Sequence, residues 1–394
     1  NWYLVVSTAN TSGFEFHVWT GDTFDTSGGT VTTQGAGTGD LHVDTSAVAT
    51  IDTGTSVIAG DVDVDGTLNL GASVNFGGAT FVSAGTTAAT AGTHTFTTTT
   101  AISGGGTINF YDLATSGTGT LTLSSAASTD SDVSVGSGTT FKINANLDVN
   151  GGQLATVTTG IVTYDSGTPT VTITGTGDIG VTSGSGEVKF YNLTTNGASG
   201  TTTLKQNITV ANALSVGTSH AFAMGTTSPT IGSNTISDSG DITMASGATS
   251  THTSGTVTIL GYSNAADWTG PGTFTAYNLT IGNGSAMTVD NETSDLPLDV
   301  NNTFTTSAGA TFQASSTAAF NVGGNWSNSA TAVFTPNSST VVMDATTGTP
   351  TITSGGDAFN NLSIDNSGTV ITWTIQDALD VNGNLLIDTS NTLD

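Results

Sequence analysis

Three aspartates at alternate positions form the clearest candidate for metal chemistry in this chain. Asp61, Asp63 and Asp65 precede Gly66 in the spacing D-x-D-x-D-G. Alternate carboxylates of this kind open calcium-binding loops, in which they converge on a hard cation. The twelfth position, however, is Ala72 where such a loop supplies a bidentate glutamate, and the valines between the aspartates also fit an alternating strand with a solvated face. Calcium is therefore the one metal that this pattern suggests, and we expect no required cofactor.

The histidines do not form a recognisable motif. The chain has five, and no two of them are four residues apart or in a His-x-His pair: His17, His42, His94, His220 and His252. Metal sites and catalytic triads that can be recognised from sequence have histidines at close, regular spacing. The sequence therefore predicts five separate histidines on exposed positions or strand faces.

Catalysis on a polysaccharide is the enzymatic alternative to consider for an all-β chain of this kind. A lyase acting on acidic sugars needs basic side chains, but the chain has no arginine and only Lys142, Lys189 and Lys205. A hydrolase needs two carboxyl groups on one face, and no Asp-Asp pair occurs in the sequence. We therefore expect a protein that is not an enzyme.

The charge balance excludes further classes of partner. The 394 residues carry 30 Asp+Glu against 3 Lys+Arg, a formal net charge of −27. Phosphate-backbone binding depends on basic side chains, so a nucleic-acid partner is excluded, and an anionic membrane surface would repel the chain. No apolar run approaches the roughly 18 residues of a membrane span, so we expect no membrane insertion. The absence of cysteine rules out disulfides and thiolate metal sites.

Short strands must position whatever chemistry the chain has. Threonine and serine alternate with valine, isoleucine and leucine in runs of about 4–6 residues, and clusters of Gly, Asn, Asp or Ser end each run. Residues 170–174 (TVTIT) and 256–260 (TVTIL) are examples. This pattern predicts an all-β fold, either a sandwich or a solenoid of short strands.

An internal repeat favours the solenoid. One pattern occurs four times, as GGGTINFYDLAT (104–115), GSGEVKFYNLTT (184–195), GPGTFTAYNLTI (270–281) and SGGDAFNNLSID (354–365), and its shared leucines, Leu113, Leu193, Leu279 and Leu362, are 80, 86 and 83 residues apart. A second pattern, seen as LDVNNTF (298–304) and LDVNGNLLI (379–387), follows each copy. A repeat of about 80 residues in preserved order predicts stacked coils in which each coil covers the apolar side of the next.

The residues from 323 to 394 carry a resemblance to a known group of proteins. The succession GGNWSNSATAVFTP, TVVMDATTGTPTITSGG, AFNNLSIDNSGTVITW and LDVNGNLLIDTSNTLD resembles the repeats of large secreted or cell-surface bacterial β-strand-repeat proteins, the adhesin-like β-solenoids. This resemblance implies an extended right-handed parallel β-helix outside the cell and no catalytic residues. Trp326 lies in the Gly-Asn-Trp strand of the repeat, so we expect it to serve packing rather than sugar stacking.

Two segments follow from the repeat. Residues 1–35 are rich in aromatics and depart from it, which predicts an N-terminal cap or interface segment. Residues 36–394 form about four to five repeats and end within one of them at Asp394. An uncapped solenoid end exposes unpaired strand backbone, so we expect an end-to-end homopolymer or a longer parent chain.

Together these observations predict an extracellular structural protein, a segment or subunit of a surface filament that self-associates. The alternative is an adhesin stalk, in which the N-terminal aromatic segment or another chain binds a surface glycan or a receptor.

Overall fold

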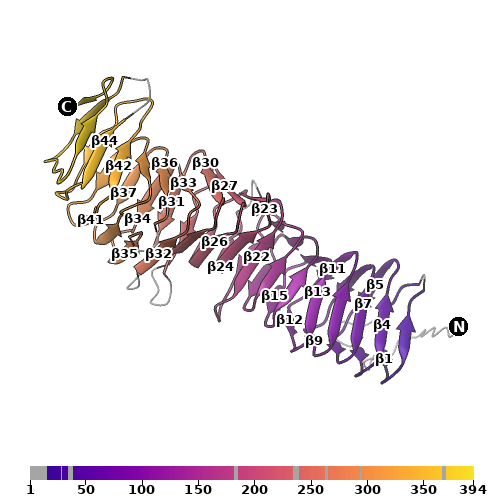
Figure 1. The fold of residues 1–394 in the computed structure, drawn as a ribbon. Coiled ribbons are helices and arrows are strands. Elements are labelled where there is room, and N and C mark those ends of the chain that lie inside the picture. The colour runs from indigo at the N-terminus through magenta and orange to yellow at the C-terminus, as the bar shows by residue number, and fades with distance from the viewer. Residues whose placement is uncertain are drawn as a thin grey trace. The chain divides into compact units, whose positions relative to one another are not determined.

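The computed structural model describes residues 16–27, 29–33, 39–181, 185–233, 239–261, 265–292, 295–365 and 370–394. Within these ranges every regular element is a β-strand, and the strands form parallel sheets stacked as a β-solenoid of about 17 turns with about 21 residues per turn (Figure 1). The prediction of an all-β solenoid is confirmed. No helix among the described residues is long and apolar enough to cross a membrane.

The chain divides into two compact units. Unit 1 consists of Asn1–Pro169 with Gly184–Glu187, and unit 2 of Thr170–Ser183 with Val188–Asp394. The described part of unit 1 holds strands β1 to β21, and that of unit 2 holds β22 to β47. Each unit is described separately below.

Unit 1 has three strands in most of its turns, and each strand pairs in parallel with the equivalent strand one turn later. The first ladder is β1 (Phe16–Val18), β3 (Leu41–Val43), β6 (Val62–Val64), β9 (Thr80–Ser83), β12 (Thr100–Ser103), β15 (Thr120–Leu123), β18 (Thr140–Ile143) and β21 (Ile161–Thr163). The second is β2 (Thr23–Asp25), β4 (Val48–Ile51), β7 (Thr67–Leu70), β10 (Thr86–Ala89), β13 (Thr107–Phe110), β16 (Ala127–Thr129) and β19 (Leu147–Val149). The third is β5 (Thr55–Ile58), β8 (Ser73–Phe76), β11 (Thr93–Phe96), β14 (Asp112–Thr115), β17 (Val133–Val135) and β20 (Leu154–Thr156).

Unit 2 is built in the same way but with a less regular coil. Its longest ladder is β22 (Thr170–Thr174), β24 (Lys189–Asn196), β26 (Thr209–Val216), β28 (Thr230–Ile231), β31 (Thr256–Ile259), β34 (Asn278–Ile281), β37 (Phe304–Thr306), β40 (Trp326–Asn328), β43 (Thr351–Thr353), β45 (Thr372–Ile375) and β47 (Thr392–Leu393). The second half of β26 starts another ladder with β29 (Asp241–Met244), β32 (Ala265–Thr269), β35 (Met287–Asp290), β38 (Ala310–Gln313) and β41 (Val333–Thr335).

Two further ladders complete unit 2. One contains β23 (Gly177–Ile179), β25 (Thr201–Leu204), β27 (Ala221–Gly225) and β30 (Thr249–His252). The other contains β33 (Phe274–Ala276), β36 (Leu298–Val300), β39 (Phe320–Val322), β42 (Thr340–Met343), β44 (Asn361–Ile364) and β46 (Leu385–Ile387).

Alternation at period two decides which side chains enter the core. In β7, Leu68 and Leu70 are buried while Thr67 and Asn69 are partly exposed, because successive residues of a strand point to opposite faces. The pairing register preserves this alternation from one turn to the next, since Leu68 pairs with Ala49 on one side and Thr87 on the other. Each coil therefore covers the apolar side chains of its neighbours.

Aromatic side chains fill the core in clusters that span several coils. In unit 1 the rings of Phe76 and Phe96 are stacked with their centroids 5.1 Å apart. In unit 2, Trp326 is 1% exposed, and its ring centroid lies 4.7 Å from that of Phe304 and 4.8 Å from that of Phe334. The prediction that Trp326 serves packing is confirmed.

The 80-residue repeat corresponds to about four turns of the coil. Its four shared leucines lie on β14, β24, β34 and β44, and all four are buried: Leu113, Leu193, Leu279 and Leu362. Of the predicted N-terminal segment 1–35, residues 1–15 lie outside the described part of the chain. Strands β1 and β2 of that segment already pair within the ladders of unit 1. A capping role for residues 1–35 stays a prediction.

Candidate functional site

A group of histidines and aspartates lies on the outer face of the first described coils of unit 1. Leu41 and Val43 of β3 are buried, as are both valines of β6, so the residue between each pair, His42 or Asp63, points outward. The parallel register then places His17 of β1 opposite His42, and His42 opposite Asp63. Three consecutive coils thus contribute one polar side chain each to a single outward row.

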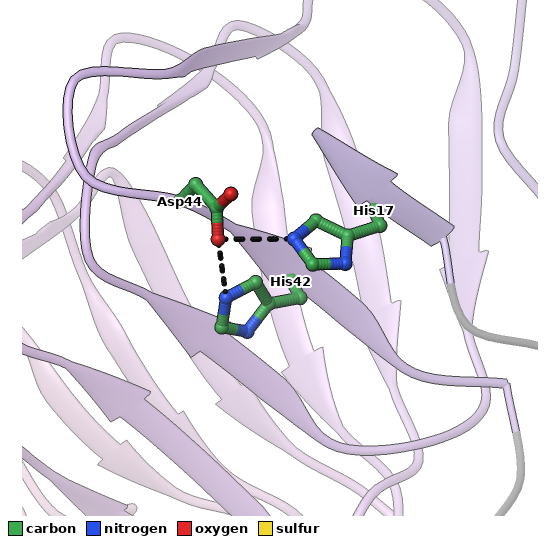
Figure 2. Close-up of side chains that lie close together, drawn as sticks. All are labelled: His17, His42 and Asp44. Atoms are coloured by element: carbon green, nitrogen blue, oxygen red, sulfur yellow. Dashed lines mark hydrogen bonds and ion pairs between the residues drawn. The ribbon is translucent and has the colours of Figure 1, made fainter. Parts of the chain in front are cut away.

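Asp44 joins the two histidines (Figure 2). One of its oxygens, Oδ1, lies 3.0 Å from Nε2 of His17 and 2.9 Å from Nε2 of His42. The other oxygen, Oδ2, accepts hydrogen bonds from the backbone N–H and the hydroxyl of Thr20, at 3.1 and 3.2 Å. The contact with His17, together with those from Thr20 and His42, lowers the pKa of Asp44 from 3.8 to about 2 although partial desolvation acts in the opposite direction. This carboxyl group is therefore ionised at any pH near neutrality.

His42 also contacts a second carboxylate. Its Nδ1 lies 3.1 Å from Oδ2 of Asp63. His42, Asp63 and Asp65 each offer an atom within 4.8 Å of the others, and the same holds for His17, His42 and Asp44. The imidazole of His42 is therefore shared by two adjacent groups of metal-ligand atoms. The stacked ring of Trp19, 3.9 Å from that of His17 and nearly parallel to it, packs beside the first group.

The structure separates the three aspartates of the predicted calcium motif. Asp63 lies within β6, whereas Asp61 precedes the strand and Asp65 follows it. Asp61 accepts a hydrogen bond from the backbone N–H of Thr80, and its own N–H donates to Asp40. Only Asp63 and Asp65 belong to a group of ligand atoms, and they do so with His42. Calcium bound by Asp61, Asp63 and Asp65 stays a prediction.

The remaining histidines are buried rather than exposed. In His220, Nδ1 lies 3.0 Å from the carbonyl oxygen of Gly197, and Nε2 lies 2.9 Å from the hydroxyl of Thr202. In His252, Nε2 donates to the carbonyl oxygen of Thr227, and Nδ1 accepts from the N–H of Tyr277. The sequence gave no indication of these interior positions.

Neither nitrogen of His94 has a hydrogen-bond partner among the described residues. Burial lowers the pKa of His94 from 6.5 to about 4, although the nearby backbone of Asp112 and Ala72 and the carboxylate of Asp112 partly offset this shift. The ring is therefore a neutral, buried imidazole at pH 7.

The contact between His17 and His42 could not be recognised from their spacing, because 25 residues separate His17 from His42 and 21 separate His42 from Asp63. These distances in sequence are close to one coil of about 21 residues. Comparing positions one coil apart is the signal that would have brought the three residues together.

Comparison with known proteins found no matching family model, no matching curated protein and no matching solved structure.

Proposed function

We propose that this chain is an extracellular structural protein, a segment of a surface filament whose coils associate end to end. Three features support the proposal: parallel ladders that continue from coil to coil, a thin apolar core shared between neighbouring coils, and an outer surface rich in threonine, serine and aspartate. Such a solenoid gains stability from each added coil through nearest-neighbour contacts. Its net charge of −27 opposes sideways association.

The observation that carries the proposal is the last strand of the described ladders. β46 pairs with β44 on one side, and no strand among the described residues pairs with its other side. Leu385 and Ile387 are in register with Leu362 and Ile364, which are buried. On β46 these same core positions are 47% and 39% exposed. An unpaired strand with uncovered core positions fits the addition of another coil.

We commit to a second copy of this chain as the partner that adds the coil in a solution of the isolated chain. A head-to-tail contact between two different surfaces does not close on itself, so it produces open filaments rather than dimers. The longer-parent alternative uses the same strand edge with a covalently continuous coil.

The test compares two substitutions on the same strand. Leu385→Asp places a charge at a core position of β46, whereas Leu386→Asp places the same charge on the opposite face, opposite Ser363. We expect the wild-type chain and Leu386→Asp to form polymers as concentration rises, seen by sedimentation velocity and electron microscopy. We expect Leu385→Asp to remain monomeric. Polymers of Leu385→Asp that match the wild type would place the contact elsewhere, and a monomeric wild type would refute self-association.

A stalk that presents a glycan-binding end is the second candidate, and Trp19 favours it. This side chain is 62% exposed, unlike the buried Trp268, Trp326 and Trp373. An exposed indole offers a flat face on which sugars stack. Glycan binding by the monomeric Leu385→Asp chain that is lost on adding Trp19→Ala would favour this candidate over the filament.

A further inference from the structure

Three atoms able to bind a metal converge at one point on the outer face of unit 1. They are Nε2 of His17, Nε2 of His42 and Oδ1 of Asp44 (Figure 2). The two nitrogens lie 3.0 and 2.9 Å from the same oxygen. Because a carboxylate oxygen only accepts, each nitrogen that faces it must present a proton or a bound cation. The arrangement is therefore one that a cation completes.

The spacing of these atoms suits a small tetrahedral ion. With metal–nitrogen and metal–oxygen distances of about 2.0–2.1 Å, the ligands of tetrahedral Zn²⁺ lie about 3.3 Å apart. The two nitrogen–oxygen distances at Asp44 are only a few tenths of an ångström shorter. Small rotations of the side chains would open the group enough to admit the ion.

Outer partners hold two of the three ligands in orientation. His42 presents its Nδ1 to Oδ2 of Asp63 at 3.1 Å, which leaves Nε2 for the metal. Thr20 donates two hydrogen bonds to Oδ2 of Asp44 and so leaves Oδ1 for the metal. Histidine ligands of metals regularly donate their second N–H to a carboxylate, and ligating carboxylates are themselves hydrogen-bonded. A cluster formed only by surface acids has no such arrangement.

The side chains are accessible to a solvated ion. His17, His42 and Asp44 are each 21–22% exposed. Water can therefore reach the ion and occupy the fourth position, as in zinc sites with three protein ligands. The stacked Trp19 covers one face of the His17 ring, which limits how far that ligand can turn away.

We propose that His17, His42 and Asp44 bind one divalent first-row transition-metal ion, with Asp63 positioning His42. Two imidazoles and one carboxylate suit zinc, copper or nickel, whereas calcium prefers six to eight oxygen ligands. The site goes beyond the structural role proposed above, and its test is independent of polymer formation.

The experiment titrates the full metal-free chain with Zn²⁺ by calorimetry in the presence of excess Ca²⁺. We expect one saturable site per chain. His17→Gln and His42→Ala should each abolish it, and Asp63→Asn should weaken affinity about 10–100-fold, as is typical for second-shell carboxylates. Asp61→Asn is the matched control and should bind as the wild type does, because Asp61 belongs to neither ligand group.

Circular dichroism of each metal-free variant verifies that it is folded, and Co²⁺ in place of Zn²⁺ should give the intense visible bands of four-coordinate cobalt, which require an assembled site. Three results would overturn the proposal. The first is Zn²⁺ uptake that excess Ca²⁺ displaces, which would indicate dispersed carboxylates. The second is binding that persists in folded His17→Gln. The third is binding lost in Asp65→Asn but kept in His17→Gln, which would assign the ion to His42, Asp63 and Asp65 instead.

Discussion

His94 shows what a single buried polar side chain does to this fold. It lies at the inward-facing second position of β11, in register with Val74 and Leu113, and its ring centroid is 5.7 Å from that of Phe110. Both ladder neighbours are apolar, and neither ring nitrogen has a hydrogen-bond partner in the described structure. A buried polar group without a partner costs about 1–3 kcal/mol. His94 is therefore a weak point within an otherwise apolar stack.

Replacing His94 with leucine should stabilise the protein and change its response to pH. The pKa of His94 is about 4 in the folded chain and near 6.5 when unfolded, so between these values the unfolded chain binds more protons. Stability is therefore complete above about pH 6.5 and falls by on the order of 3 kcal/mol as pH drops towards 4. Denaturant unfolding of His94→Leu should show a higher midpoint at pH 7.5 and no such loss at pH 4.5.

His220→Leu is the control for this substitution. It also removes a buried imidazole, but it leaves the buried hydroxyl of Thr202 without the nitrogen that lies 2.9 Å from it. We therefore expect His220→Leu to lower the midpoint, in contrast to His94→Leu. An unchanged loss of stability between pH 6.5 and 4 in His94→Leu would show that another group titrates there.

At the scale of the element, glycines set how closely successive turns approach. Gly66, Gly85 and Gly106 follow equivalent strands on consecutive coils, and the N–H of each donates to a backbone carbonyl one coil earlier. A Cβ atom on Gly85 would lie 2.0 Å from the carbonyl oxygen of Gly66, and one on Gly106 would lie 1.8 Å from that of Gly85. No side chain fits in this column, so the turn sequence determines the stacking.

Gly106→Ala should destabilise unit 1, because its methyl group would collide with the Gly85 carbonyl and push two hydrogen-bonded coils apart. Overpacking of this kind typically costs about 1–3 kcal/mol. Gly105→Ala adds the same methyl group one residue earlier, where nothing lies within 4 Å, and should change stability little. Thermal unfolding of the two variants measures the difference, and equal midpoints would contradict the proposed steric constraint.

The alternation of residues predicted the strands well but predicted their neighbours less well. The segment DVDVDG suggested both a strand and a calcium loop, and the structure makes Val62–Val64 a strand with Asp63 outward. Which side chains meet across coils depends on coil length, and this length varies: 25 residues separate the paired His17 and His42, whereas 19 separate Val62 and Phe81. No fixed period reveals such contacts. The sequence therefore predicted the fold without predicting the histidine cluster.

The long strands of unit 2 were also beyond sequence-based prediction. β26 pairs with β28 through Thr209 and Val210, and with β29 through its residues from Ala213 to Val216. One strand thus begins two ladders. The alternation is interrupted there by adjacent buried residues, Val210 and Ala211, which a period of two does not anticipate.

At the scale of the whole molecule, acidic side chains recur on the outer face of successive coils. Burial raises the pKa of Asp299, and burial with repulsion from Asp299 and Asp365 raises that of Asp344. Stacking outward residues one coil apart therefore brings like charges together, at a cost to the folded state. The same charges discourage sideways contact between solenoids. The surplus of acids is thus a compromise between coil stability and solubility.

The scarcity of basic residues predicts resistance to trypsin. The chain offers only Lys142, Lys189 and Lys205 for cleavage, and the backbone of each is hydrogen-bonded within a ladder or to the neighbouring coil. Two of these side chains also form ion pairs, Lys142 with Asp165 at 2.6 Å and Lys205 with Asp178 at 3.4 Å. A protease needs an extended, unpaired segment, which these strands provide only after unfolding.

We expect the native chain to remain intact under trypsin concentrations that convert the heat-unfolded chain to four fragments, the number that cleavage after 3 Lys+Arg produces. Proteinase K, which does not require basic residues, is the control: it should degrade the unfolded chain extensively and leave the native coils largely intact. This comparison separates protection by the fold from a simple lack of cleavage sites. Native cleavage at Lys142 as fast as in the unfolded chain would show that the ladder of β15, β18 and β21 opens readily, which a load-bearing solenoid cannot do.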